Sequence, residues 1–114
     1  MAAVKVSIVE YPFEGEIYRT FIDDSKPLEE QIEEKVVVLR TKCDIQEASS
    51  YNRGNFINAT YNIYMPFDTN KTINFKRGDL FEANAYGMVV NGEIIGIYPS
   101  QLGGISLFIK DIDV

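Results

Sequence analysis

The sequence contains no histidine and no tryptophan, and it has a single cysteine among its 114 residues. Without imidazole, the commonest general base and the commonest zinc ligand are both missing, as is every nucleophile arrangement that depends on His. The lone Cys43 has no partner for an internal disulfide. We therefore expect no catalytic residues, no cofactor and no metal site, and we interpret the chain as a protein that binds or assembles, not an enzyme.

Basic residues are also scarce, with 11 Lys and Arg against 17 Asp and Glu and a formal net charge of -6. Eleven of the acidic residues lie in residues 1–50, so the excess negative charge belongs to the first half of the chain. Nonspecific binding of duplex DNA needs clustered cations, and the only adjacent basic pair is Lys76-Arg77. This composition disfavours direct nucleic-acid binding.

Long apolar segments are absent as well. The longest apolar stretches are strand-sized, well short of the ~20 residues of a membrane-spanning helix, and no signal-peptide pattern opens the chain. We expect a soluble protein, made in a reducing cytoplasm and without a membrane partner. Hydrophobic residues make up 46% of the sequence and are spread along it, so residues 1–114 are expected to fold as one domain.

Alternation of apolar and polar residues predicts strands along most of the chain. The clearest are residues 57–65 and residues 35–46, and in the latter the side chains of Val37, Leu39, Thr41, Cys43 and Ile45 share a face. Further strands are expected at residues 4–9, 17–22, 80–90, 93–98 and 105–112, with a short edge strand at residues 72–75. Pro27 followed by Leu28 and Ile32 predicts one or two helical turns. The sequence thus predicts an all-β protein, a small antiparallel barrel or sandwich of about six strands with one short helical turn.

Turn signals divide these strands. Asn91-Gly92 is the strongest, because this pair tolerates the positive φ angles of a two-residue type I′ hairpin, and it predicts that Val89 faces Ile94 and that Gly87 faces Gly96. Further reversals are expected at residues 11–15 and at Gly78-Asp79. The tripeptide Arg77-Gly78-Asp79 matches the sequence that integrins recognise, but a Gly-Asp turn into the next strand already explains it.

Two sets of residues are candidates for chemical reactivity, the single cysteine and the paired carboxylates. Cys43 lies on the inferred buried face of its strand, so we predict an inert core thiol. The pairs Asp23-Asp24, Glu29-Glu30 and Glu33-Glu34 supply the two carboxylates that glycoside hydrolysis uses. A solvated acidic surface is the ordinary explanation of such runs, and the chain has no tryptophan to stack on sugars.

The order of features from residue 56 onward is a long alternating strand that ends at Pro66, the Gly78-Asp79 turn, the Asn91-Gly92 turn, and then Gly96-Ile97-Tyr98-Pro99-Ser100. This layout resembles that of the small β-barrel head-closure or head–tail connector proteins of tailed bacteriophages. The resemblance implies a non-enzymatic structural protein that self-associates into a ring between a portal or adaptor and the tail proteins. It further implies assembly in the host bacterial cytoplasm, followed by incorporation into the virion.

In such a ring DNA only passes through the channel, and an acidic wall repels its phosphates. On this interpretation residues 23–35 and 48–55 are the candidates for contacts with neighbours or the channel, and we expect Tyr64 and Tyr98 to be exposed interface aromatics. An alternative remains open, because residues 96–100 are also similar to the end of an SH3 domain, which binds proline-rich peptides. The acidic and aromatic early loop of that domain has no clear counterpart here.

Overall fold

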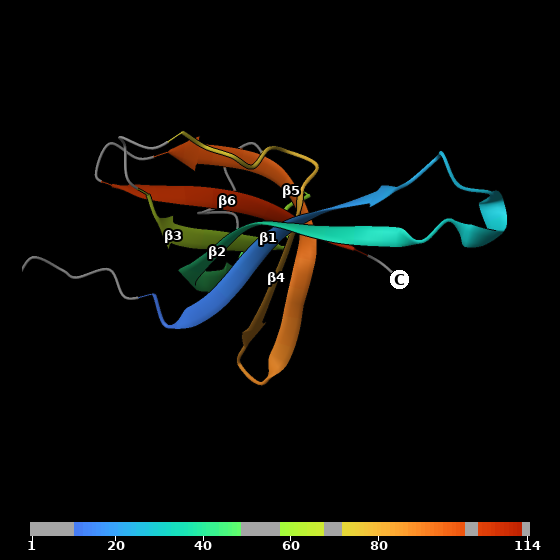
Figure 1. The fold of residues 1–114 in the computed structure, drawn as a ribbon. Helices are drawn as coiled ribbons and strands as arrows, with labels where there is room; N and C mark the ends of the chain where they lie inside the picture. Colours follow the sequence, from blue (N-terminus) through green and yellow to red (C-terminus); the bar gives the residue numbers. More distant parts are fainter. Residues whose placement is uncertain (1–10, 49–57, 68–71, 100–102, 113–114) are drawn as a thin grey trace, which may run out of the picture.

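The described strands close into a barrel. The computed structural model describes residues 11–48, 58–67, 72–99 and 103–112. These residues form β1 (Phe13–Ile22), a 3-10 turn η1 (Leu28–Glu30), β2 (Glu33–Glu47), β3 (Tyr61–Pro66), β4 (Leu80–Ala85), β5 (Met88–Pro99) and β6 (Gly104–Asp111). All pairings are antiparallel, and the strand order β1-β2-β3-β6-β5-β4 closes through the pairing of β4 with β1 (Figure 1). The predicted all-β fold of about six antiparallel strands with one short helical turn is confirmed.

Alternating side chains fill the barrel. Ile105, Leu107 and Ile109 of β6 are buried, and the residues between them are partly exposed. Cys43 and Ile45 of β2 contribute to the same hydrophobic core, together with residues of the other four strands, which are Ile17, Ile63, Met65, Phe81, Ala83, Ala85, Val90 and Ile94. The period of two read from the sequence therefore places the core correctly at Cys43, Ile45, Ile105, Leu107 and Ile109. It is wrong at Val37, which pairs with Tyr18 on the outer face.

The first hairpin extends beyond the barrel. β1 pairs with β4 only as far as Tyr18, whereas its pairing with β2 continues to Ile22, which lies opposite Glu33. Residues 19–36, here called the arm, are thus a two-stranded ribbon that η1 closes at its tip, and Figure 1 shows it projecting from the barrel. At its base Ile17 opposes Leu39 and Tyr18 opposes Val37, which leaves Val38 unmatched. Such a bulge bends and twists a strand, so it redirects the ribbon where it leaves the barrel.

The predicted turn at Asn91-Gly92 is wrong. Tyr86 and Gly87, with φ angles of 53° and 75°, join β4 to β5 instead, and both Asn91 and Gly92 lie within β5. Val89 consequently faces Asn84, and Gly96 faces Phe108 on β6 instead of Gly87. The reason is close packing, because a Cβ atom on Gly92 would lie 2.4 Å from the Lys110 carbonyl oxygen. Gly92 allows β6 to approach closely, and it does not reverse the chain.

Several predicted boundaries also differ. No reversal occurs at residues 13–15, because β1 begins at Phe13, and β2 begins at Glu33, two residues before the predicted start at Lys35. Residues 72–75 are not a strand, although Phe75 is buried in the core.

The strand predicted at residues 57–65 begins only at Tyr61, and Ile112 follows the end of β6. The strand predicted at residues 4–9 and most of the loop predicted at residues 48–55 lie outside the described residues.

Candidate functional site

The arm exposes large apolar side chains. Leu28 and Ile32 at its tip are 84% and 72% exposed, and Phe21, Ile22 and Val36 along the ribbon are each about half exposed. By the strand register Phe21 and Val36 lie on the face that continues the barrel interior, whereas Ile22 lies on the opposite face. The sequence prediction named residues 23–35 as contact candidates but missed the exposed apolar side chains and the ribbon that carries them.

The arm also concentrates the negative charge of the protein. Residues 23–34 contain six carboxylates and one lysine, so they carry -5 of the formal net charge of -6. Within the described residues Glu29, Glu30, Glu33 and Glu34 form no ion pair. The tip therefore combines uncompensated acidic groups with uncovered apolar side chains.

Local hydrogen bonds order the tip. The Glu30 amide donates to the Pro27 carbonyl oxygen at 2.8 Å, and the Gln31 side-chain amide donates to the Lys26 carbonyl oxygen at 3.1 Å. The Ser25 amide and hydroxyl both donate to a carboxylate oxygen of Asp23, at 3.0 and 2.6 Å, and these bonds lower the pKa of Asp23. These hydrogen bonds, all within residues 23–31, hold the tip in a defined conformation.

On the outer face of the barrel, Lys35 ties the arm to its base. Its ammonium group donates to Glu16 on β1, lies 3.4 Å from a Glu82 carboxylate oxygen on β4, and sits 4.4 Å from the centroid of the Tyr18 ring. The hydrogen bond from Lys35 lowers the pKa of Glu16, and that same bond raises the pKa of Lys35. Arg40 adds a longer contact of 3.4 Å to Glu16.

On the inner side, Arg19 anchors the arm to the segment that precedes β4. Its guanidinium group donates to both carboxylate oxygens of Asp79, at 2.8 and 3.2 Å, and to the Asn74 carbonyl oxygen at 2.7 Å. The Lys76 amide donates to the same carboxylate at 2.9 Å, and Asp79 is only 3% exposed. Pairing with Asp79 raises the pKa of Arg19.

This anchor also settles the Arg77-Gly78-Asp79 tripeptide. Gly78 has a φ of 96° in the turn that leads into β4, as the turn interpretation predicts. The Asp79 carboxylate is buried and already accepts three hydrogen bonds, so it is not presented to an external receptor. The tripeptide is part of the structural anchor of the arm.

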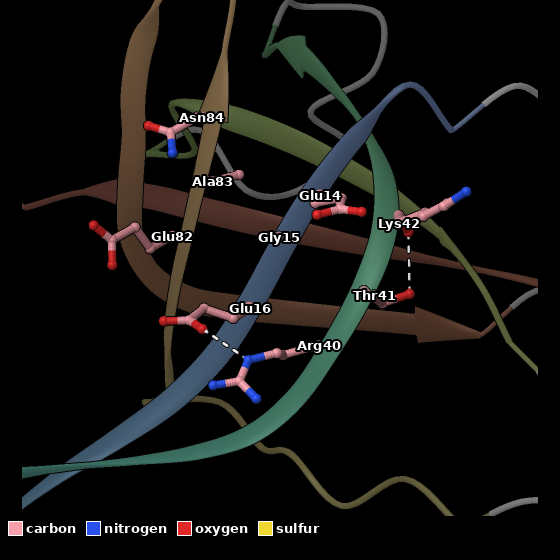
Figure 2. A pocket seen from close by; sticks show the side chains of 9 residues that line it. All are labelled: Glu14, Gly15, Glu16, Arg40, Thr41, Lys42, Glu82, Ala83 and Asn84. Atoms are coloured by element: carbon pink, nitrogen blue, oxygen red, sulfur yellow. Dashed lines mark hydrogen bonds and ion pairs between the residues drawn. The ribbon is translucent and has the colours of Figure 1, made fainter.

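A charged hollow of about 700 Å³ lies over β1, β2 and β4. Figure 2 shows its three rows of residues, Glu14, Gly15 and Glu16 on β1, Arg40, Thr41 and Lys42 on β2, and Glu82, Ala83 and Asn84 on β4. A Cβ atom on Gly15 would lie 2.8 Å from the Phe81 ring, so the glycine is needed for core packing below the hollow. Lys35 pairs with Glu16 and Glu82, and Arg40 pairs with Glu16, so cross-strand ion pairs link β1, β2 and β4 at this hollow.

The remaining predicted residues lie apart from the arm. Cys43 is completely buried, and burial raises the pKa of its thiol to about 11, as expected of an inert core cysteine. Tyr98 is 51% exposed and packs edge-on against Phe108, with 5.6 Å between ring centroids. Tyr64 is only partly exposed, so of the two predicted exposures only that of Tyr98 is confirmed.

No protein-family model matches the chain, and no curated protein sequence matches it. Among the described residues no helix has the length and apolar character needed to cross a bilayer. In the same residues no three His, Cys, Asp or Glu side chains gather in a way that suits a metal ion. The arm, ordered at its tip and anchored at its base, is therefore the candidate site, and its chemistry suits a protein contact.

Proposed function

We propose that this protein is a non-enzymatic structural protein that assembles into a ring, as a head-closure or head–tail connector of a tailed bacteriophage virion. The observation that carries the proposal is the arm. A two-stranded ribbon is only marginally stable alone in water, and in this one Leu28 and Ile32 are largely exposed to solvent. Exposed clusters of large apolar side chains mark contact surfaces, so the arm is the part that engages neighbouring subunits.

The closed barrel supports the same role. Strand addition at an open sheet edge is a common way for β proteins to recruit partners, but the pairing of β4 with β1 removes the edge that this would use in the barrel. The projecting arm offers another surface for a contact. The arm is anchored to the barrel on both faces, by Lys35 and by Arg19, so it transmits a contact to a rigid body.

The charge distribution fits a part that surrounds DNA without binding it. Residues 23–34 of the arm carry -5 of the formal net charge of -6. Acidic arm residues that face the channel repel phosphates and allow a duplex to slide through a ring. In this role the partners are further copies of the chain, a portal or adaptor ring, and tail proteins, first in the host bacterial cytoplasm and then in the virion.

Assembly is expected to depend on a platform. A contact made mainly by one arm tip covers a small area, and interfaces at the low end of the size range are weak. A preformed ring raises the effective concentration of subunits that bind side by side on it, which makes a weak contact sufficient. The isolated chain can therefore be monomeric at low concentration and still close a ring on a portal.

The test is to mix the protein with the portal or adaptor ring of a tailed bacteriophage and to determine mass and stoichiometry by sedimentation and electron microscopy. Many copies around one axis are the expected result. The control is a variant in which residues 20–35 are replaced by an Asn-Gly turn, which keeps the barrel and should not load. A chain that stays monomeric and binds one proline-rich peptide at one site would replace the connector with a small-barrel binding module.

A further inference from the structure

Two hollows have linings that share residues of the segment 72–77. The first has a volume of about 560 Å³, and its lining includes Leu39, Met65 and Phe67. The second has a volume of about 450 Å³, and its lining includes Lys76, Arg77, Ile97 and Tyr98. Ile73 and Phe75 line both hollows, so we treat them together as the 72–77 groove.

The 72–77 groove is apolar with a basic rim. Lys76 and Arg77 are exposed and are the only adjacent pair of basic residues in the sequence. Neither side chain takes part in an ion pair with any described residue. The Arg19 bond to the Asn74 carbonyl oxygen and the Lys76 amide bond to Asp79 fix the backbone from which they project.

We propose that the arm tip of one copy docks into the 72–77 groove of a second copy. In this contact Leu28 and Ile32 cover the apolar lining, and Glu29 and Glu30 lie beside Lys76 and Arg77. The inference rests on the proposed function and names its subunit contact. Charge complementarity is the argument for the occupant, because the acidic tip carries exposed apolar side chains and the 72–77 groove combines an apolar lining with two basic residues.

The contact must be made between copies. Arg19 at the arm base is bonded to Asn74 and Asp79, so the 72–77 groove begins beside the base of its own arm. β1 continues for four residues beyond its last barrel pair, about 13 Å at the ordinary rise of a strand. The tip lies beyond the end of β1, and Figure 1 shows it pointing away from the barrel. Because the tip and the 72–77 groove are different surfaces, each copy can contact one neighbour through its tip and another neighbour through its groove. Repetition of such a head-to-tail contact closes a ring when the rotation allows it.

A charge-swap experiment on the full chain tests the contact. The tip variant carries Glu29→Lys and Glu30→Lys, and the groove variant carries Lys76→Glu and Arg77→Glu. Each variant alone is expected to self-associate roughly tenfold more weakly than the wild type in sedimentation at millimolar concentration. An equimolar mixture of the two is expected to recover association, because each tip then meets a groove of opposite charge. All four side chains are exposed, so unchanged unfolding curves verify that the variants fold.

Zero-length cross-linking supplies a second readout that does not require a stable ring. In a mixture of isotopically light and heavy wild-type protein, a carbodiimide should join the Lys76 amine of one copy to Glu29 or Glu30 of the other. Absence of this link, together with unchanged association of both variants, would overturn the contact.

Failure of the proposed function can be distinguished from failure of the tip-to-groove contact. A wild type that loads onto a portal ring while the swaps and cross-links show nothing keeps the ring and rejects this contact. A cross-link and a successful charge swap in a protein that never loads onto a portal keeps the contact and rejects the phage role.

Discussion

The barrel and the arm are built from the same two strands, yet they treat apolar side chains in opposite ways. Within the barrel, Ile17 of β1 and Cys43 of β2 are completely buried. A few residues further along, Phe21 and Val36 fall on the continuation of that inner face and are about half exposed. These residues are all apolar and lie on the same face. Their exposure differs because strands β3 to β6 cover that face in the barrel and do not extend over the arm.

This difference shows where the folding free energy of the chain resides. Burial of apolar surface stabilises the barrel. The arm is held instead by the antiparallel pairing of β1 with β2, by hydrogen bonds within its tip, and by the Lys35 and Arg19 ion pairs at its base. The arm retains hydrophobic surface that folding does not use. That surface is the one that the proposed subunit contact would cover.

The largest expected effect compares two phenylalanines. Phe81→Ala should lower the free energy of unfolding by about 4 kcal/mol, because Phe81 is fully buried in the barrel and its loss leaves a cavity. Phe21→Ala on the arm is the matched control and should cost about 0.5 kcal/mol, since this ring is 47% exposed. Urea titrations measure both changes. Similar losses in the two variants would show that the arm belongs to the cooperative core.

Two glycines test the position of the hairpin. Gly92→Val should cost about 3 kcal/mol, because the new side chain would overlap the Lys110 carbonyl group and the Ile109 side chain in the adjacent strand. Gly87→Ala should cost only about 1 kcal/mol, because its Cβ meets nothing within 4 Å and the cost comes from the positive φ angle alone. The reverse order in thermal or urea unfolding would restore the turn to Asn91-Gly92.

The buried thiol of Cys43 should make the stability of the protein depend on pH. The native pKa is about 11 and the ordinary value is 9.0, so the unfolded chain loses its proton first as the pH rises. Stability is therefore fully present below pH 9 and falls between pH 9 and 11, by about 2 to 3 kcal/mol in the limit. Cys43→Ala should flatten this part of the pH dependence. A thiol reagent should label Cys43 only after denaturant is added, and rapid labelling of the native protein would contradict its burial.

The junction between the two regions depends on Asp79. Asp79→Ala should lower the free energy of unfolding by about 2 kcal/mol, because three hydrogen bonds to a buried carboxylate are lost together. Glu29→Ala at the exposed arm tip is the control and should be neutral within about 0.5 kcal/mol. Hydrogen exchange should show that Asp79→Ala loosens residues 19–22 and 74–79 more than β6. Uniform loosening of the barrel would mean that Asp79 does not act as an anchor.

The sequence predicted those parts of the fold that depend on local alternation. Ile105, Leu107 and Ile109, like Cys43 and Ile45, were placed correctly because a strand with one buried face repeats every two residues. The β4–β5 turn was missed because distant contacts outweighed local preference. Tyr86 has a φ of 53°, its hydroxyl donates to the Ile45 carbonyl oxygen at 3.0 Å, and its ring packs edge-on against Phe13 with 4.8 Å between centroids.

The candidate site was predictable in its place in the sequence, its acidity and its short helical turn, but not in its projection from the barrel. Residues 23–35 contain obvious carboxylates, but their projection from the barrel depends on where β4 stops pairing with β1 and on the bulge at Val38. Neither feature has a local sequence signal. The Arg19 and Asp79 partners are 60 residues apart, and the tripeptide that contains Asp79 suggests a turn without naming its partner.

The smallest effect on stability should accompany a large effect on assembly. The double variant Leu28→Ser and Ile32→Ser removes the two most exposed apolar side chains of the arm tip, so the free energy of unfolding should change by less than about 0.5 kcal/mol. The same variant should weaken self-association roughly tenfold or more, because buried anchors at the centre of a contact contribute most of its binding energy. Val36→Ser is the matched control, since Val36 is 46% exposed but lies at the arm base, and it should associate normally. If the tip variant and the Val36 variant lose association equally, the arm acts through its general hydrophobicity and not through a docked tip. If the tip variant instead unfolds more easily and associates normally, the apolar tip serves the fold of its own chain, and the division between a self-sufficient barrel and an arm that needs a neighbour is wrong.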